Sequence, residues 1–332
     1  MVTSYDPELN LIYVGTSVTS PAPKFMLGGN DLAHLYHNST LALDVDTGDI
    51  RWYYQHLNDH WDLDHPFERL LLDTVVAPDP ATVPWINPRL RPGEVRKVMT
   101  GIPGKTGIVW ALDAATGAFL WAEPTNFQNV VVDIDAESRR VILNSSLKFP
   151  EVGKPVFVCP SVLGGVNWQA TAYHPGTNAL YASTNNVCND LTLNEFRDRP
   201  GAHHGSARIA QAPAPDIDGQ IGQFTAMDLT TGQPLWVYRQ RAGMGGSVLT
   251  TGGGLVFVTD DARRFRAFDA RSGDILWEQI LNSSAGGFPV SYMHDGEQYI
   301  AIAAGGGINF RGLTPEIQQP GRGNTLFVFK LP

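Results

Sequence analysis

Short runs of aliphatic, β-branched and aromatic residues alternate along this chain with clusters of Gly, Pro, Asn and Asp. Runs of about four to eight residues that end at such clusters are typical of strands rather than helices. The pattern therefore predicts an all-β fold in which tight turns join many short strands. The clearest predicted strands are Leu11–Gly15, Gly107–Leu112, Leu180–Ser183, Leu255–Thr259, Tyr299–Ala303 and Thr325–Leu331.

Four copies of one eleven-residue pattern, Ala-x-Asp-x-x-Thr/Ser-Gly-x-x-x-Trp, run through the sequence. In each copy we expect Ala-x-Asp to end a strand, Asp-x-x-Thr/Ser-Gly to form a tight turn, and the Trp to open the next strand. The Trp ring is large enough to cover the following repeat, and its N–H can donate a hydrogen bond. The last two copies begin 41 residues apart, which is the spacing of β-propeller blades. The copies are Ala42–Trp52, Ala111–Trp121, Ala226–Trp236 and Ala267–Trp277.

The wider gaps between the other copies leave room for loops or for a blade whose motif has drifted. We expect Pro78–Arg96 to be an excursion between strands and Asp198–Ile221 to be a long surface loop. The copies and gaps together predict about four to five blades in a single domain over residues 1–332. Because an open arc of blades exposes a sheet at each end, we expect an incomplete ring that belongs to a larger propeller or has covered ends. The strand Leu11–Gly15 begins without a secretory signal before it, so we expect the N-terminal part of a longer protein to be missing.

Composition narrows the classes of function. The net charge of −9 argues against nucleic-acid binding, which favours a basic surface. We find no apolar run of about 18 residues or more, so no membrane span is predicted. The two cysteines, Cys159 and Cys188, are compatible with two buried thiols or with one disulfide in an oxidising compartment.

Ionisable residues crowd the segment that follows the first Trp motif. If Trp61–Asp64 is extended, the carboxylates of Asp62 and Asp64 point to the same side, about 6–7 Å apart. Two neighbouring carboxylates repel unless a cation neutralises them or one of them is protonated, so this segment is a candidate metal site or acid–base pair. A solvated acidic loop is the alternative, and the two histidines are expected to be orienting or surface groups. The residues concerned are Asp59, His60, Asp62, Asp64, His65 and Glu68.

Two further candidates stand beside glycines. Lys105 lies in a glycine-flanked turn before a predicted strand, without the spacing or the helix of a phosphate-binding loop. A lysine in such a turn is usually solvated. Asn167 follows Gly164 and Gly165, where an asparagine often serves a strand-entry turn for structural reasons alone.

Taken in order, these segments resemble the pyrroloquinoline-quinone (PQQ) dependent alcohol dehydrogenases, the eight-bladed quinoproteins that include methanol dehydrogenase. The resemblance covers nearly the whole chain. It is carried by Tyr5–Thr16, His60–Asp64, Lys105–Asp113, Cys159–Ser161, Asn167–Trp168, Gly245–Phe257 and Thr325–Pro332. The Trp repeats alone are weak evidence, because non-catalytic propellers share them; the combination with the Trp-Asp and Lys-x-Gly segments is specific.

The resemblance implies roles for single residues. Asp62 matches the family's catalytic aspartate, the proposed base for the alcohol hydroxyl, and it would also contact PQQ and the metal. Lys105 matches a basic residue that contacts the quinone oxygens and would stabilise charge there. Asn167 matches an asparagine that contacts PQQ. Cys159 and Cys188 match a family disulfide, which implies a periplasmic, extracytoplasmic location.

The implied metal is calcium or a lanthanide, which would polarise the quinone carbonyl as a Lewis acid. Asp64 resembles a second aspartate that lanthanide-dependent members carry two residues after the catalytic one, although calcium-type members can share it. The family's Gly-Asn-Pro metal turn is replaced by Gly15–Pro23, which has no Asn, so one metal ligand is in doubt. Met244 stands where the family often has Trp.

The sequence is thus interpreted as the C-terminal part of a PQQ-dependent alcohol dehydrogenase. It would oxidise a primary alcohol or related hydroxyl compound by hydride transfer to PQQ and pass electrons to an external acceptor such as a cytochrome c or a quinone. A homodimer is a possible assembly, and we expect weak or no activity from these 332 residues alone. The alternative is a non-catalytic PQQ-repeat scaffold of the cell envelope, which would leave Asp62, Lys105 and the cysteine pair without a role.

Overall fold

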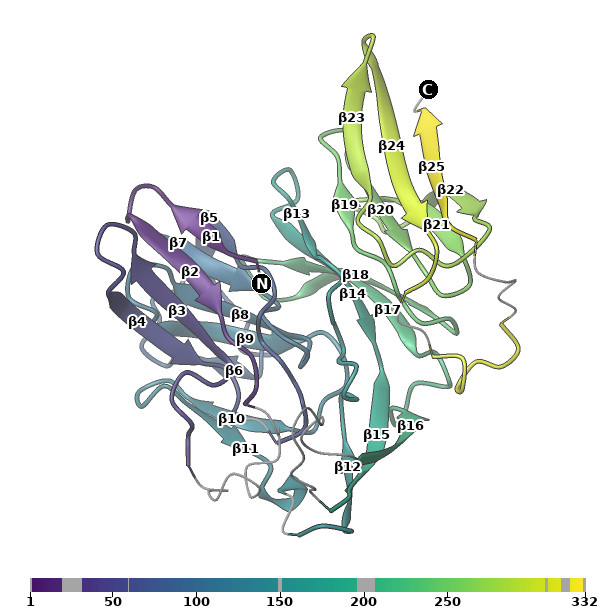
Figure 1. Cartoon of the computed structure of the whole chain (residues 1–332). Helices are drawn as coiled ribbons and strands as arrows, with labels where there is room; N and C mark the ends of the chain where they lie inside the picture. Colours follow the sequence, from purple (N-terminus) through teal and green to yellow (C-terminus); the bar gives the residue numbers. More distant parts are fainter. Residues whose placement is uncertain are drawn as a thin grey trace. The chain divides into compact units, whose positions relative to one another are not determined.

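The computed structural model describes residues 2–19, 32–58, 60–148, 151–195, 207–307, 310–317 and 323–330. The chain forms two compact units (Figure 1). The first comprises Met1–Asn167 and Val187–Pro215, and the second comprises Trp168–Asn186 and Asp216–Pro332. A single domain over residues 1–332 stays a prediction. No helix among the described residues has the length and apolar character that a membrane crossing requires.

The first unit contains four antiparallel sheets and a short 3-10 helix, Ser145–Leu147. One sheet has the strand order β1 (Ser4–Asp6), β2 (Leu11–Gly15), β3 (Ser39–Asp44), β4 (Ile50–Gln55). A second has the order β5 (Leu70–Val76), β7 (Glu94–Gly101), β8 (Ile108–Asp113), β9 (Phe119–Pro124), β6 (Trp85–Ile86). The two smaller sheets pair β10 (Val131–Asp135) with β11 (Arg140–Leu143), and β12 (Pro155–Val158) with β15 (Val187–Leu193) and β16 (Ala207–Pro213).

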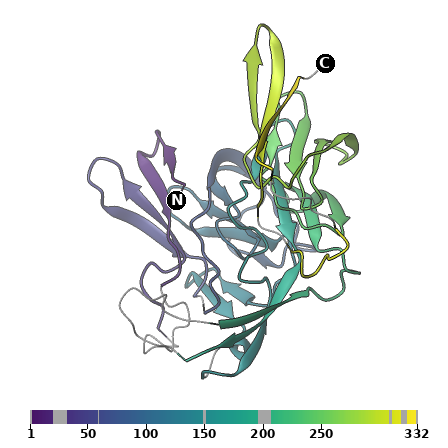
Figure 2. The ribbon, with the colours of Figure 1, turned by 45° about the vertical axis from the view of Figure 1, so that its right-hand side comes forward.

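The described residues of the second unit form three antiparallel sheets. Their orders are β13 (Ala172–His174), β14 (Ala179–Asn185), β17 (Gly222–Asp228), β18 (Pro234–Gln240); then β19 (Leu249–Thr250), β20 (Leu255–Thr259), β21 (Arg264–Asp269), β22 (Ile275–Ile280); and β23 (Val290–His294), β24 (Glu297–Ala304), β25 (Thr325–Lys330). The hairpin of β23 and β24 is visible as a long two-stranded ribbon (Figure 2). All six predicted strands are confirmed as β2, β8, β14, β20, β24 and β25, with ends that differ by a few residues. Leu331, the last residue of the sixth, lies outside the described part.

The four motif copies each form the predicted strand–turn–strand unit. Within each turn the glycine adopts φ between 66° and 77°, a conformation that favours glycine. Its N–H donates to the carbonyl oxygen of the motif aspartate, while that aspartate's carboxylate accepts from the N–H of the Thr or Ser. In the third copy the Asp228 carboxylate accepts from the N–H of Thr230, the first of two consecutive threonines. The backbone pairs are Gly48 with Asp44, Gly117 with Asp113 and Gly232 with Asp228, each at 2.8 Å, and Gly273 with Asp269 at 3.0 Å.

Two of the motif tryptophans cover the next copy, as the pattern predicts. The Nε1–H group of Trp52 donates to the carbonyl oxygen of Ala114, and that of Trp236 donates to Ala270, both at 3.1 Å. A Cβ atom on Gly117 would lie 2.5 Å from the Trp52 ring, so the turn needs glycine for space as well as for its φ. Each Trp thus ties one sheet to its neighbour within its own unit.

The two predicted loops contain strands. Within Pro78–Arg96, the short strand β6 adds to the edge of the second sheet beside β9, and β7 begins at Glu94. Within Asp198–Ile221, the strand β16 pairs with β15 along seven residues, so the prediction of a loop is wrong there. Backbone pairing with β15 outweighs the weak strand propensity of this Ala-rich segment. Residues 198–206 lie outside the described part.

Candidate active site

The loop after β4 carries Asp62 between two buried apolar side chains. Trp61 is 1% exposed and donates from Nε1 to the carbonyl oxygen of Leu147 at 3.0 Å, and Leu63 lies in the same core. Asp62 adopts φ 64°, a left-handed conformation that is uncommon outside glycine. The condition of an extended Trp61–Asp64 segment is therefore not met, because the main chain turns at Asp62 and directs its carbonyl oxygen to a lysine.

That lysine is Lys105, in the turn between β7 and β8. Its main-chain N–H donates to the carbonyl oxygen of Asp64 at 2.8 Å. Gly104 packs so tightly against His65 that a Cβ atom there would lie 2.3 Å from the ring. Lys105 is only 7% exposed, so the interpretation of a solvated turn lysine is wrong. The tight glycine packing places this side chain against the acidic loop instead of in water.

The ammonium group of Lys105 joins the two carboxylates. Its Nζ lies 2.8 Å from Asp64 Oδ2, 3.3 Å from Asp62 Oδ2 and 2.9 Å from the Asp62 carbonyl oxygen. The Asp62 side chain remains 51% exposed, whereas that of Asp64 is 19% exposed. A solvated acidic loop does not describe this arrangement: two carboxylates converge on one buried cation. Asp59 lies outside the described residues.

The two carboxylates differ in their protonation behaviour. Burial raises the pKa of Asp62; Lys105 opposes this and Asp64 adds to it, and the net direction is upward. Burial also acts to raise the pKa of Asp64, but Lys105, Ser17 and the Val18 N–H outweigh it, so that pKa is lowered. When the pKa values of two neighbouring carboxyl groups differ in this way, the group with the raised pKa can accept a proton while the other stays anionic.

The loop after β2 contributes an oxygen next to Asp64. The Ser17 hydroxyl donates to Asp64 Oδ1, and the Val18 N–H donates to the same atom at 3.3 Å. Both residues lie in the stretch Gly15–Pro23, where no Asn is available. The part of that stretch from residue 20 onward is outside the described residues. In place of an Asn side chain, this stretch therefore places the Ser17 hydroxyl beside the Asp64 carboxylate.

A buried network beneath the site was not predicted from the sequence. The rings of His56 and His65 stack with centroids 5.6 Å apart, and burial lowers both pKa values, that of His65 to about 3. Arg69 donates from Nε to Thr40 Oγ1 at 3.0 Å and from Nη2 to the His65 carbonyl oxygen at 2.8 Å. Thr40 Oγ1 lies 2.8 Å from His56 Nε2. His60 and His65 are both buried, so the alternative of surface histidines is wrong. An orienting role for them stays a prediction.

Asn167 lies on a loop that contacts the Lys105 turn. The Gly165 N–H donates to the Lys105 carbonyl oxygen at 2.8 Å, and a Cβ atom on Gly164 would lie 2.9 Å from Lys105 Cβ. Asn167 is 7% exposed and donates from Nδ2 to the carbonyl oxygen of Leu163 at 2.8 Å. This bond supports the structural role expected for an asparagine after Gly-Gly.

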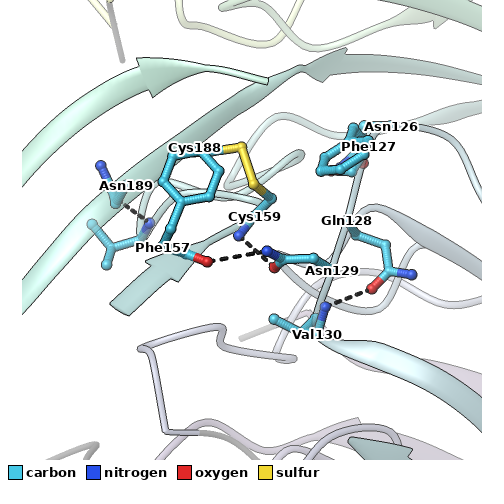
Figure 3. The surroundings of a disulfide bond; sticks show 10 residues. Asn126, Phe127, Gln128, Asn129, Val130, Phe157, Cys159, Cys188 and Asn189 are labelled. Atoms are coloured by element: carbon cyan, nitrogen blue, oxygen red, sulfur yellow. Dashed lines mark hydrogen bonds between the residues drawn. A yellow bond between two sulfur atoms is a disulfide. The ribbon is translucent and has the colours of Figure 1, made fainter. Parts of the chain in front are cut away.

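The two cysteines form a disulfide (Figure 3). Cys159 follows β12 and Cys188 lies on β15, with Cα atoms 4.4 Å apart. The peptide bond between Cys159 and Pro160 is cis. Asn129 accepts from the Cys159 N–H at 2.8 Å and donates to the Phe157 carbonyl oxygen at 3.0 Å. The alternative of two buried free thiols is therefore wrong.

With this geometry in place, comparison with known proteins assigns the family. The model of the family described as "PQQ: Glucose/ethanol/alcohol dehydrogenase, beta-propeller domain" matches residues 1–86 and 217–300. The chain belongs to this PQQ propeller family. The prediction of a quinoprotein-type β-propeller is confirmed, and the matched regions contain Asp62 and Asp64 of the acidic loop.

Among the family's members, the chain is 30% identical to the quinoprotein alcohol dehydrogenase PedH of Pseudomonas putida, over 99% of this chain and 53% of PedH. It is 30% identical to methanol dehydrogenase [cytochrome c] subunit 1 of Methylobacterium organophilum, over 96% of this chain and 49% of that protein. The structure superimposes on a europium-containing methanol dehydrogenase with a TM-score of 0.84 and 25% identity, over 99% of this chain and 58% of that one. The chain spans about half the length of the curated relatives it matches.

The side chains at this site fit the groups that a PQQ propeller implies. Asp62 and Asp64 supply carboxylate oxygens and Ser17 a hydroxyl, the hard donors that calcium and lanthanides prefer. Lys105 and Asn167 place a cation and an amide on two loops in contact, which suits quinone and carboxylate oxygens. Within the described ranges, no group of three or more His, Cys, Asp or Glu side chains is arranged to hold a metal. These residues therefore fit as one part of a ligand shell.

Proposed function

We propose that this chain forms part of the active site of a PQQ-dependent dehydrogenase that oxidises a primary alcohol or a related hydroxyl compound. The observation that carries the proposal is the convergence of Asp62 and Asp64 on the buried ammonium of Lys105, in a chain of the PQQ propeller family. The names of the relatives, an alcohol dehydrogenase and a methanol dehydrogenase, support this class of substrate.

Asp62 is the group best suited to accept the proton of the alcohol hydroxyl. Its carboxylate is half exposed, so a substrate can reach Oδ2, and its raised pKa favours proton uptake. Lys105 holds that carboxylate from one side through Nζ and stabilises negative charge that develops nearby. In this role Asp62 would take up the proton that the alcohol hydroxyl loses. Bound PQQ would supply the two-electron acceptor for the hydride from the alcohol carbon.

Asp62 and Asp64 would hold the metal, calcium or a lanthanide, which would act as a Lewis acid. Asp64 is suited to remain anionic, because Lys105, Ser17 and the Val18 N–H stabilise its charge. A second carboxylate suits the charge of a trivalent ion, and the europium-containing relative supports a lanthanide. Asn167 and Lys105 would contact PQQ from the two joined loops.

The surroundings of this activity are also proposals. The disulfide supports an oxidising, periplasmic location. A cytochrome c, named in one relative, or a quinone would accept the electrons. We propose that the two units are parts of one propeller domain whose ring the chain does not complete, and we expect slow or no turnover from these 332 residues alone.

The test uses the purified chain with PQQ and either calcium or lanthanum. Binding of PQQ is measured by its quenching of tryptophan fluorescence, and turnover by a dye-linked alcohol assay. We expect measurable PQQ binding that Asp62→Asn and Lys105→Met weaken, and any turnover to be lost in Asp62→Asn. Failure of the chain to bind PQQ with either metal would contradict the proposed function. Equal PQQ affinity in the wild type and both variants would also contradict it, and is the result that a non-catalytic scaffold would give. Robust turnover would support the function but contradict the expected weakness of the chain alone.

A further inference from the structure

Asn126 lies between Gly107, in the turn that carries Lys105, and Gly165, in the loop that carries Asn167. It follows β9 by two residues and is only 7% exposed. A Cβ atom on Gly107 would lie 1.5 Å from its Oδ1, and one on Gly165 would lie 2.2 Å from the same atom. The amide therefore fills the space that a side chain at either glycine would need.

The two glycines control the positions of Lys105 and Asn167. Gly107 ends the Lys105 turn with φ 71°, and the Thr125 N–H donates to its carbonyl oxygen at 2.9 Å. Gly165 donates to the Lys105 carbonyl oxygen and precedes Asn167 by two residues. The amide of Asn126 is thus wedged where these two segments meet.

The hydrogen bonding of Asn126 is poor for a buried amide. Its Nδ2 donates only to the adjacent carbonyl oxygen of Phe127, at 3.0 Å, and its Oδ1 is buried with no hydrogen-bond partner among the described residues. Such a group costs stability, and its presence in a buried position calls for another explanation. An apolar residue of similar size would be more stable here if packing were the only requirement.

We propose that Asn126 is a positioning residue that sets the spacing between Lys105 and Asn167 around the quinone. The proposal rests on the proposed function, because the two residues that it positions are those expected to contact PQQ. The rigid, planar amide of Asn126 fills the space between Gly107 of the Lys105 turn and Gly165 of the Asn167 loop, and so keeps the two segments apart. The Gly165–Lys105 hydrogen bond keeps them from separating further.

The test exploits a size exchange between Asn126 and Gly165. The three atoms nearest to a Cβ on Gly165 all belong to Asn126, and Gly165 does not have a positive φ. The closest contacts of the added Cβ in Gly165→Ala are therefore with Asn126, and Asn126→Ala should relieve them. Asn87→Ala is the matched control, because Asn87 donates to the Phe119 carbonyl oxygen at 2.8 Å, at the opposite end of β9.

Two readouts are measured on the folded chain: the dissociation constant of PQQ in the presence of lanthanum, and hydrogen–deuterium exchange of the peptides that contain Gly107 and Gly165. We expect Asn126→Ala and Gly165→Ala each to weaken PQQ binding about tenfold or more and to speed exchange of the Gly165 N–H. The double variant should bind PQQ more tightly than either single variant, whereas Asn87→Ala should match the wild type.

The outcomes separate the positioning role from the function on which it rests. If PQQ affinity in Asn126→Ala equals that of the wild type, or if the double variant shows purely additive losses, the positioning role is wrong. If the wild-type chain does not bind PQQ, the proposed function fails, and hydrogen exchange alone then decides whether Asn126 couples the two loops. Unchanged exchange in both single variants would overturn that coupling.

Discussion

The main-chain N–H of Lys105 donates a 2.8 Å hydrogen bond to the carbonyl oxygen of Asp64. The acidic loop and the lysine turn are therefore joined through their backbones as well as through the ion pairs. This bond does not depend on the lysine side chain, so the charge can be removed while the two segments stay in contact.

Lys105→Met should lower the affinity for PQQ about tenfold to a hundredfold, and it should also lower the melting temperature, because Asp62 and Asp64 lose the buried cation that neutralises them. Methionine retains the aliphatic stem that packs on Gly164, and only the ammonium is lost. PQQ titration and thermal unfolding check this. Lys97→Met is the matched control, because Lys97 pairs with Asp6 and Glu8 instead of the site. Equal PQQ affinity in Lys105→Met and the wild type would remove Lys105 from the cofactor site.

Asp64→Asn should weaken terbium binding about tenfold or more, because a neutral amide is a poorer ligand than a carboxylate for a trivalent ion. Terbium luminescence sensitised by the adjacent Trp61 reports binding without any turnover. Asp46→Asn, in an exposed turn of the first Trp motif, serves as the control. A terbium affinity that is the same in both variants would argue against Asp64 as a ligand.

The stability of the second unit should fall as the pH rises from about 5 to 8. Burial, with a smaller effect of Asp260, raises the pKa of Asp261 from 3.8 to about 8. The folded state therefore binds a proton more tightly than the unfolded state, and this contribution is full below pH 3.8 and lost as the pH approaches 8.

Asp261→Asn should remove that dependence and be the more stable protein at pH 8, by an amount on the order of a few kcal/mol. Urea unfolding of both proteins at pH 5 and pH 8 tests this. Glu123→Gln is a useful comparison in the other unit, because burial also raises the pKa of Glu123, to about 7. Parallel pH profiles for the wild type and Asp261→Asn would contradict the prediction.

Trp52→Phe should destabilise the first unit by about 1–3 kcal/mol, since it removes the hydrogen bond to Ala114 and part of the ring that packs on Gly117. Urea unfolding followed by circular dichroism measures the change. Trp168→Phe, at a 59% exposed position, should have a much smaller effect. A loss in Trp168→Phe as large as that in Trp52→Phe would show that the repeat tryptophans do not join the sheets.

Replacing both cysteines by serine should cost about 2–4 kcal/mol, because the disulfide closes a loop with a sequence separation of 29 residues. The oxidised wild type should show no titratable thiol before reduction. Reduced wild type and the double serine variant should unfold at similar urea concentrations. Two freely reacting thiols in non-reduced protein would contradict the disulfide.

The local pattern along the chain was sufficient for the repeat turns and for six of the strands, but not for β16 or for the site. The Ala-x-Asp and Gly positions dictate their own turns through bonds such as those of Asp44 and Gly48, so the repeats could be predicted from neighbouring residues. The strand β16 could not, because its pairing with β15 is made by a segment of weak strand propensity.

Contacts between distant segments explain what the sequence missed. Arg69, His56 and Thr40 meet only after β3, β4 and the following loop have folded together. Nothing in their spacing indicates a network. Asp62 and Lys105 are 43 residues apart, and only the family resemblance, not periodicity, indicated that both serve the same cofactor.

The left-handed backbone of Asp62 restricts which residues can stand at this position. Asparagine, like aspartate, tolerates φ near 64°, whereas a β-branched side chain would have to unwind the segment that Trp61 and Leu63 anchor. Loss of the carboxylate through most single replacements would thus also deform the loop. Among relatives that lack an aspartate at the position of residue 62, asparagine or glycine is the residue that we expect to be inherited most readily.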